Sequence, residues 1–412
     1  MIRLNSARFM KILGAIGMLS LVLAGLAGCG GGATSTNTTP IKIGFTVSLT
    51  GDFSADGLAF KQGYQLWAND VNAKGGILGR KVTLDILDDA SNPDTVTTDY
   101  QKLITVDKCD FVIGPFSTLL TKPASVVAHR YGYALLEGAG GGPSVFQQGL
   151  NNVFDVSLPV ANNLVSFAQW ILALPASQRP QSAAYATEDD PFTQPQVDLA
   201  RSILEQGGVK TAYYHVYPAE TTDFTPIAQN VIHSGAQVDV FGTLLPDISA
   251  FIQAFKQQHY NPQAMIATAG PDQGTQFLNN IGGAASAEGI FVPNGWYAEL
   301  NAPGNQAMVN EYVAKYGGTP DEISSDIAEA YSVGQVLDQA VTHNNSLDNS
   351  KLIQELHSGT FDSVQGKVKF DSTGQNTAAT SYEFQWQSGK LIPVYPPAVA
   401  SAQPEFPKPN WP

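Results

Sequence analysis

The chain has 412 residues, 43% of them hydrophobic, which is long enough for two domains of ordinary globular composition. Its 22 basic and 36 acidic residues give a formal net charge of −14. This excess of acid argues against nucleic acid and against a polybasic membrane patch as partners. The two cysteines, Cys29 and Cys109, are too few for a thiolate metal cluster, and we expect neither a metal nor a cofactor.

The first 28 residues are typical of a signal peptide. Residues 1–11 carry three basic and no acidic side chains, and the apolar run over 12–27 is too short and glycine-rich for a comfortable membrane span. The run ends in Leu26-Ala27-Gly28-Cys29, which resembles the bacterial lipoprotein signal, where the cysteine is acylated and becomes the new N-terminus. A plain secretory signal with an incidental cysteine is the alternative. We predict a signal peptide over 1–28, lipidation of Cys29 and a flexible tether over 29–40.

From residue 41 onward, short apolar strands alternate with amphipathic helices. Strands are expected at 41–45, 82–86, 111–113 and 133–136, and again at 183–186, 212–216, 238–241 and 265–267. Short apolar strands separated by helices predict parallel sheets covered on both faces. The fold class is therefore α/β, with two doubly wound parallel-sheet lobes that divide near 153–159. Segments after 289 should return to these lobes, and the last twenty residues, with seven prolines, should wrap a surface or remain loose.

Glycine- and hydroxyl-rich loops follow several of these strands, on the side where a crevice between two such lobes binds ligands. Residues 138–143 begin like a dinucleotide fingerprint, but Pro143 stands where glycine or alanine should close the helix–strand contact. A backbone N–H cradle suited to a carboxylate fits better, although a glycine turn without ligand contact remains open. Ser117 and Thr118 can cap the following helix or present hydroxyl groups to an anion.

Catalytic constellations are not found in the sequence. The six histidines have no metal-ligand spacing to one another, and neither His-Glu-x-x-His nor Gly-x-Ser-x-Gly occurs. Cys109 lies at the entry to an apolar strand, where a packed structural thiol is favoured over a reactive one. We therefore predict that the protein is not an enzyme.

Several segments in order resemble the leucine/isoleucine/valine-binding family of ABC-transporter substrate-binding proteins. The most specific is 73–81, and the others are 41–51, Asp88-Asp89, 114–118, 131–149, Ala330-Tyr331 and 366–371. The resemblance covers the chain from residue 41 and implies the type I periplasmic-binding fold. Its lobes would comprise 41–157 with 293–365, and 158–292 with 366–412. A three-segment hinge would cross between them near 155–158, 291–294 and 366–369 and close the lobes over a ligand.

The resemblance also implies binding residues, position by position. The hydroxyl-bearing loop is matched by Ser117, Thr118 and Leu119, the backbone N–H loop by Ala139, Gly140 and Gly141, the covering aromatic by Phe192, a further contact by Leu244, and the acid for the amino group by Asp272. Asp272 has an alternative role as a helix cap. Leu119, Phe53, Phe192 and Leu244 would make the pocket roomier and more apolar than in relatives, and hydroxyls are missing on the carboxylate side. We expect an amino acid or a related small carboxylate or amide as ligand.

In function, the resemblance implies the receptor of an ABC importer. Such a protein is extracytoplasmic, lipid-anchored to the bacterial cell membrane through Cys29, monomeric, and docks on ABC permease subunits. The alternative is a ligand-sensing receptor of the same fold that feeds a membrane signalling partner.

Overall fold

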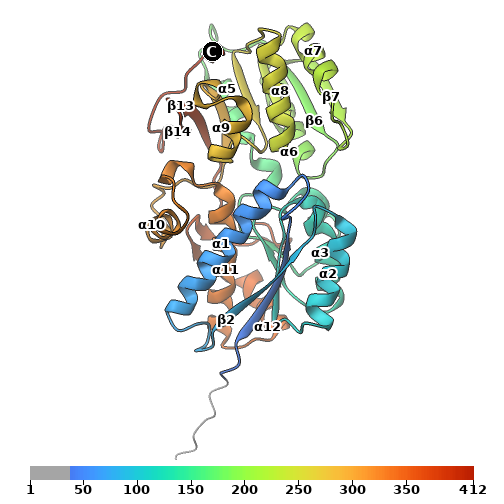
Figure 1. Cartoon of the computed structure of the whole chain (residues 1–412), viewed down its shortest axis with the longest axis vertical. Helices are drawn as coiled ribbons and strands as arrows, with labels where there is room; N and C mark the ends of the chain where they lie inside the picture. Colours follow the sequence, from blue (N-terminus) through green and yellow to red (C-terminus); the bar gives the residue numbers. More distant parts are fainter. Residues whose placement is uncertain (1–37) are drawn as a thin grey trace, which may run out of the picture. The chain divides into compact units, whose positions relative to one another are not determined.

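Two separate sheets organise the part of the chain that the structure, a computed structural model, describes, which is residues 38–412 (Figure 1). Residues 39–412 form one unit. The predicted signal peptide, the predicted lipidation site Cys29 and residues 29–37 of the predicted tether lie outside the described residues. Within the described part, no helix combines the length and apolar character needed to cross a membrane.

The first sheet has five parallel strands in the order β2-β1-β3-β4-β5. The strands are β1 (Ile41–Val47), β2 (Val82–Asp88), β3 (Phe111–Ile113), β4 (Leu135–Glu137) and β5 (Val153–Asp155). In Figure 1, α1 (Ser54–Ala73) and α11 (Ser325–Asn344) lie on one side of this sheet, and α2 (Pro93–Thr105) and α3 (Thr118–Arg130) on the other. This doubly wound arrangement explains why β1, β3, β4 and β5 are almost entirely buried.

The second sheet has seven strands in the order β14-β13-β10-β9-β8-β6-β7. The parallel strands are β6 (Ser182–Glu188), β7 (Lys210–Tyr217), β8 (Val238–Gly242), β9 (Ala264–Ala267) and β10 (Ile290–Asn294), and the antiparallel ones are β13 (Tyr382–Gln387) and β14 (Lys390–Tyr395). The helices between the parallel strands are α5 (Val165–Ala173), α6 (Thr193–Gln206), α7 (Thr225–Ser234), α8 (Leu245–Gln257) and α9 (Gly274–Ile281). The predicted class, two α/β lobes with doubly wound parallel sheets, is confirmed, with an antiparallel edge added to the second sheet.

Local sequence signals account for the helix ends. Asn92 caps α2, because its side chain accepts hydrogen bonds from the backbone N–H groups of Asp94 (2.8 Å) and Thr95 (3.1 Å). Pro93 occupies the first turn, where its missing N–H costs nothing. α1 ends at Ala73, just before Gly76, whose φ of +85° and close approach to the Arg80 carbonyl both require glycine.

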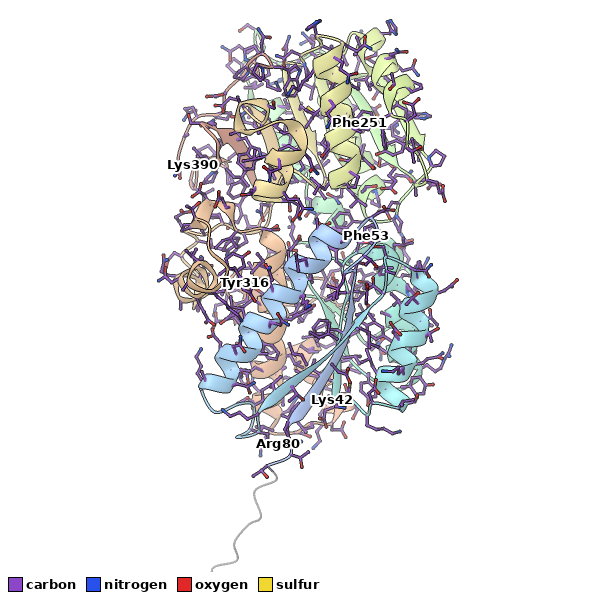
Figure 2. All side chains as sticks on the ribbon, viewed as in Figure 1. Lys42, Phe53, Arg80, Phe251, Tyr316 and Lys390 are labelled. Carbon is purple, nitrogen blue, oxygen red and sulfur yellow. The ribbon has the colours of Figure 1, made fainter. Side chains whose placement is uncertain are left out.

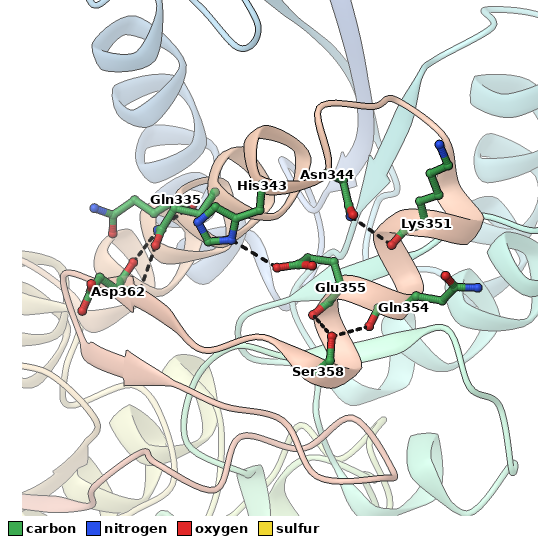
Figure 3. Close-up of polar contacts among 9 residues, drawn as sticks. Gln335, His343, Asn344, Lys351, Gln354, Glu355, Ser358 and Asp362 are labelled. Carbon is green, nitrogen blue, oxygen red and sulfur yellow. Dashed lines mark hydrogen bonds and ion pairs between the residues drawn. The ribbon is translucent and has the colours of Figure 1, made fainter.

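The segments after β10 return to the first lobe, as the sequence predicts. They comprise α10 (Asn305–Tyr316), α11, α12 (Asn349–Ser358) and the hairpin of β11 (Phe361–Ser363) and β12 (Gly366–Val368). Figure 3 shows polar contacts at the α11–α12 corner, where His343 Nδ1 lies 3.1 Å from Glu355 Oε1. The Asn344 side chain also donates to the Lys351 carbonyl at 3.0 Å. These helices therefore belong with the N-terminal sheet.

The third crossing between the lobes lies later in the structure than the expected 366–369. Residues 366–368 still pair with β11, and the Phe370 ring packs on Phe154 of β5 at a centroid distance of 5.2 Å. Asn376 then donates to the Val156 carbonyl at 2.8 Å. Because these contacts hold residues 366–376 against the first sheet, the chain crosses between Asn376 and β13. The other two crossings follow β5 and β10.

The proline-rich C-terminus wraps the second lobe. The Lys408 backbone N–H donates to the Gln263 carbonyl (2.7 Å), and the Trp411 indole donates to the Tyr260 carbonyl (2.6 Å). Of the two sequence alternatives for this tail, the surface-wrapping one is confirmed. Cys109 is packed inside the first lobe, and burial raises the pKa of its thiol to about 12, which fits a structural thiol.

Candidate functional site

A cavity lies between the two lobes, where loops from the carboxyl ends of their strands meet. The first lobe contributes Asp56 at the start of α1, Phe116 after β3, Ala139 after β4, and Asp326 and Glu329 at the start of α11. The second lobe contributes Phe192 after β6, Thr268 and Asp272 after β9, and Asn294 at the end of β10. This is the position where doubly wound sheets bind ligands.

Three of the predicted site residues line this cavity: Ala139, Phe192 and Asp272. Phe192 is buried against Phe116, with the ring centroids 5.3 Å apart, and Asp272 accepts a hydrogen bond from the Gly270 N–H at 2.9 Å. The alternative role of Asp272 as a helix cap is not seen, because α9 begins at Gly274 with no side-chain cap bond.

The other predicted residues do not line the cavity. They are Phe53, Ser117, Thr118, Leu119, Gly140, Gly141 and Leu244. Phe53, immediately before α1 and between the two lobes (Figure 2), packs edge-on against Phe116 with ring centroids 5.8 Å apart. Leu244 is buried in the same apolar cluster, and Leu119 packs against that cluster from outside. The aromatic and aliphatic residues thus support the cavity from one layer away.

The glycine loop after β4 is an N–H cradle, but two of its donors are bound within the chain. The Gly140 N–H donates to Glu137 Oε2 at 2.6 Å, and the Gly142 N–H donates to the Thr118 hydroxyl at 3.1 Å. A side chain at Gly141 would place its Cβ 2.1 Å from Asp155 Oδ2 and 2.8 Å from Glu137 Oε1. Glycine is therefore required at 141 because this loop closes over a buried pair of acids.

Sequence reasoning missed most of the acidic groups at the cavity. Gln273 of the second lobe donates from Nε2 to Asp56 Oδ1 (2.8 Å) and to Asp326 Oδ2 (2.9 Å), both in the first lobe. The carboxylates of Asp56, Asp272 and Asp326 lie within 4.8 Å of one another. The one local signal was the spacing of Asp326 and Glu329, three residues apart on one helix face.

Three acids at this spacing are a possible cation site. The Gln273 amide nitrogen already bonds to Asp56 and Asp326, and it lies 3.4 Å from Asp272 Oδ2. A neutral donor thus stands among the three carboxyl groups. The cluster is arranged as a hydrogen-bonded bridge between the lobes.

Burial and mutual repulsion raise the pKa values of these carboxyl groups. Burial raises the pKa of Asp272 to about 6, and burial with the neighbouring Asp272 raises that of Asp326 to about 7. Burial, and then repulsion by nearby carboxylates, also raises the pKa values of Asp56 and Glu329 well above normal. Burial raises the pKa of Glu137 to about 8. Among the described residues that line the cavity there is no lysine, arginine or histidine. A positively charged group of a ligand would therefore interact favourably with these carboxyl groups.

Comparison with known proteins agrees with this architecture. A family model described as "Periplasmic binding protein" matches residues 40–390. The chain is 25% identical over 385 residues to the Leu/Ile/Val-binding protein homolog 7 of Brucella suis, covering 89% of this chain and 94% of that protein.

Two solved structures are similar in fold. The branched-chain amino acid transporter substrate binding protein LivJ from Streptococcus pneumoniae, in complex with isoleucine, has a TM-score of 0.74 at 19% identity, covering 90% of this chain and 100% of that chain. A solute binding protein of an ABC transporter from R. palustris, in complex with benzoate, has a TM-score of 0.75 at 17% identity, covering 89% and 98%. Structures of this fold are thus known with an amino acid bound and with an aromatic acid bound.

Proposed function

The chain belongs to the periplasmic binding protein family, and from this premise we propose that it is the extracytoplasmic receptor of an ABC importer. The family consists of substrate-binding proteins, not enzymes. In this proposal the protein captures an amino acid or a related small carboxylate or amide between its two closing lobes. It then docks as a monomer on ABC permease subunits, and a lipid on Cys29 anchors it to the cell membrane.

The observation that carries the proposal is the cavity between the lobes, with Asp272 in its wall. Asp272 comes from the second lobe, and Asp56 and Asp326 come from the first, so a ligand with an amino group would contact both lobes. Such a ligand favours the closed form in proportion to the contacts that it makes only there. The Leu/Ile/Val-binding protein homolog of Brucella suis and the isoleucine complex from Streptococcus pneumoniae support an amino compound.

Replacing Asp272 with asparagine tests the assignment of the amino-group acceptor. Asparagine can keep the hydrogen bond that Asp272 accepts from Gly270 but removes the charge. Truncating one partner of a buried charge pair costs about 2–5 kcal/mol, so we expect affinity for an amino ligand to fall at least ~30-fold in isothermal titration calorimetry. Glu220→Gln, an exposed change in the same lobe, is the matched control and should bind as the parent does. Unchanged affinity in Asp272→Asn would show that the acid does not receive the amino group.

The lipid anchor is tested separately in bacterial cells. The full-length chain is expected in the membrane fraction, because acyl chains on Cys29 would supply the buried CH₂ groups needed for stable anchoring. Cys29→Ala should reduce the amount of mature protein in the membrane fraction, whereas Cys109→Ala should not. Equal membrane association of the parent and Cys29→Ala would rule out anchoring through this cysteine.

A further inference from the structure

We propose that the ligand is a small organic cation, an amine without a free carboxylate, such as an amino-acid amide or a diamine. This inference rests on the proposed function and narrows it, because it concerns the same cavity. It is based on the acidic side chains that line the cavity, on the loop N–H groups that already bond within the protein, and on the apolar end of the cavity.

Four acidic side chains line the cavity. Asp56, Asp326 and Glu329 stand on the first-lobe side and Asp272 on the second-lobe side, and no basic side chain is among the described lining residues. The N-termini of α1 and α11 supply only partial positive charge beside Asp56 and Asp326. A ligand cation can replace the protons that these carboxyl groups hold because of their raised pKa values, whereas the carboxylate of a zwitterion would add a further negative charge.

Two donors of the loop after β4 that could bind a ligand carboxylate are already occupied by the protein. The Gly140 N–H bonds the carboxylate of Glu137, and the Gly142 N–H bonds the hydroxyl of Thr118. The Thr118 hydroxyl is buried and therefore fixed in this role. Glu137 thus takes a place in the cradle that an anionic ligand would need.

Two further carboxylate oxygens behind this loop have no partner. Glu137 Oε1 and Asp155 Oδ2 belong to side chains that are 0% and 1% exposed, and neither accepts a hydrogen bond. Both approach Gly141, the residue that separates them from the loop surface. Unpartnered buried acceptors are costly.

The opposite end of the cavity fits the hydrocarbon part of such a ligand. Phe116 and Phe192 line it with their rings 5.3 Å apart, and Ala139 and Ala269 complete this apolar region. Aromatic faces also tolerate a neighbouring cation, which they attract, better than an anion. The site therefore combines an apolar end with an acidic end and lacks a basic one.

The matched pair L-leucinamide and L-leucine tests the inference, because the two share the ammonium group and side chain and differ in the carboxylate. Benzoate and 1,4-diaminobutane complete the panel, and residues 30–412 are titrated at pH 7 by calorimetry. We expect leucinamide to bind at least ~10-fold more tightly than leucine, and benzoate to give no binding. Tighter binding of leucine or benzoate would overturn the inference but keep the proposed function. Binding of none of the four compounds would count against both.

Glu329→Gln identifies the source of the selectivity. Glu329 lines the cavity, and burial followed by the charges of Asp326, Asp272, Glu137 and Asp56 raises its pKa. We expect the affinity ratio of leucinamide to leucine to fall at least ~5-fold in this variant and to stay at the parent value in Glu220→Gln. An unchanged ratio in a variant with the parent's circular dichroism spectrum would contradict the electrostatic origin of the preference.

Discussion

Gly63→Ala is expected to lower the stability of the protein by about 1–3 kcal/mol, although alanine ordinarily stabilises a helix interior by about 1 kcal/mol relative to glycine. Gly63 lies in the middle of α1, where this helix packs against α11. A Cβ there would lie 2.4 Å from the carbonyl oxygen of Ile327 and 2.8 Å from Cβ of Ala330. Because the obstacle includes backbone, it cannot rotate away, and the helices must separate. Urea unfolding followed by circular dichroism should show a lower midpoint.

Asn69→Ala is the matched control, since it changes an exposed residue of the same helix to the same amino acid. It should leave the midpoint unchanged or raise it slightly. The separation of α1 and α11 should also spread Asp56 and Asp326, which stand at the starts of these two helices, and so weaken ligand binding. A midpoint for Gly63→Ala at or above the parent value would mean that the two helices do not approach as closely as described.

The parallel core could be predicted because its signals are local. The predicted strand at 111–113 is β3 itself, and the apolar stripe of α1 is buried as its helical spacing indicates. The antiparallel strands β13 and β14 were not predicted. β13 contains Glu383, Gln385 and Gln387, polar residues of the kind found on surfaces, and yet all three are buried. β13 pairs with β10, about ninety residues earlier, and no pattern within the segment reports such a partner.

The candidate site was predicted only in part for the same reason. The resemblance selected Asp272, Phe192 and Ala139, each of which follows a strand in a recognisable motif, and all three line the cavity. Asp56 and Gln273 are 217 positions apart in sequence, so their hydrogen bond could not be inferred from spacing. The glycines after β4 did predict a cradle of N–H groups. What the sequence could not indicate is that Glu137 turns back from the end of its strand to fill it.

The ligand-free protein is expected to lose thermal stability as the pH rises from 5 to 8.5, with a fall in Tm of about 5 °C or more. The pKa values of Asp272, Asp326 and Glu137 are raised by burial to about 6, 7 and 8, whereas carboxyl groups in the unfolded chain titrate near pH 4. Below pH 4 both states hold these protons and the contribution to stability is fully present. As the pH rises towards 6–8, the unfolded state releases its protons first, and stability is lost until the folded groups have also ionised.

Differential scanning calorimetry at matched ionic strength measures this pH dependence. Glu137→Gln keeps an acceptor for the Gly140 N–H but cannot ionise, so the fall in Tm should be smaller in this variant than in the parent. Lys408, whose pKa is lowered to about 7 by burial, opposes the trend above pH 7, because its folded form gives up a proton that the unfolded form keeps. A saturating organic cation should raise Tm more at pH 8 than at pH 5, since the carboxylates that bind it are then charged. A Tm that rises with pH in the ligand-free protein would mean that these acids are paired with positive charge, and the cavity would no longer have a reason to select a cation.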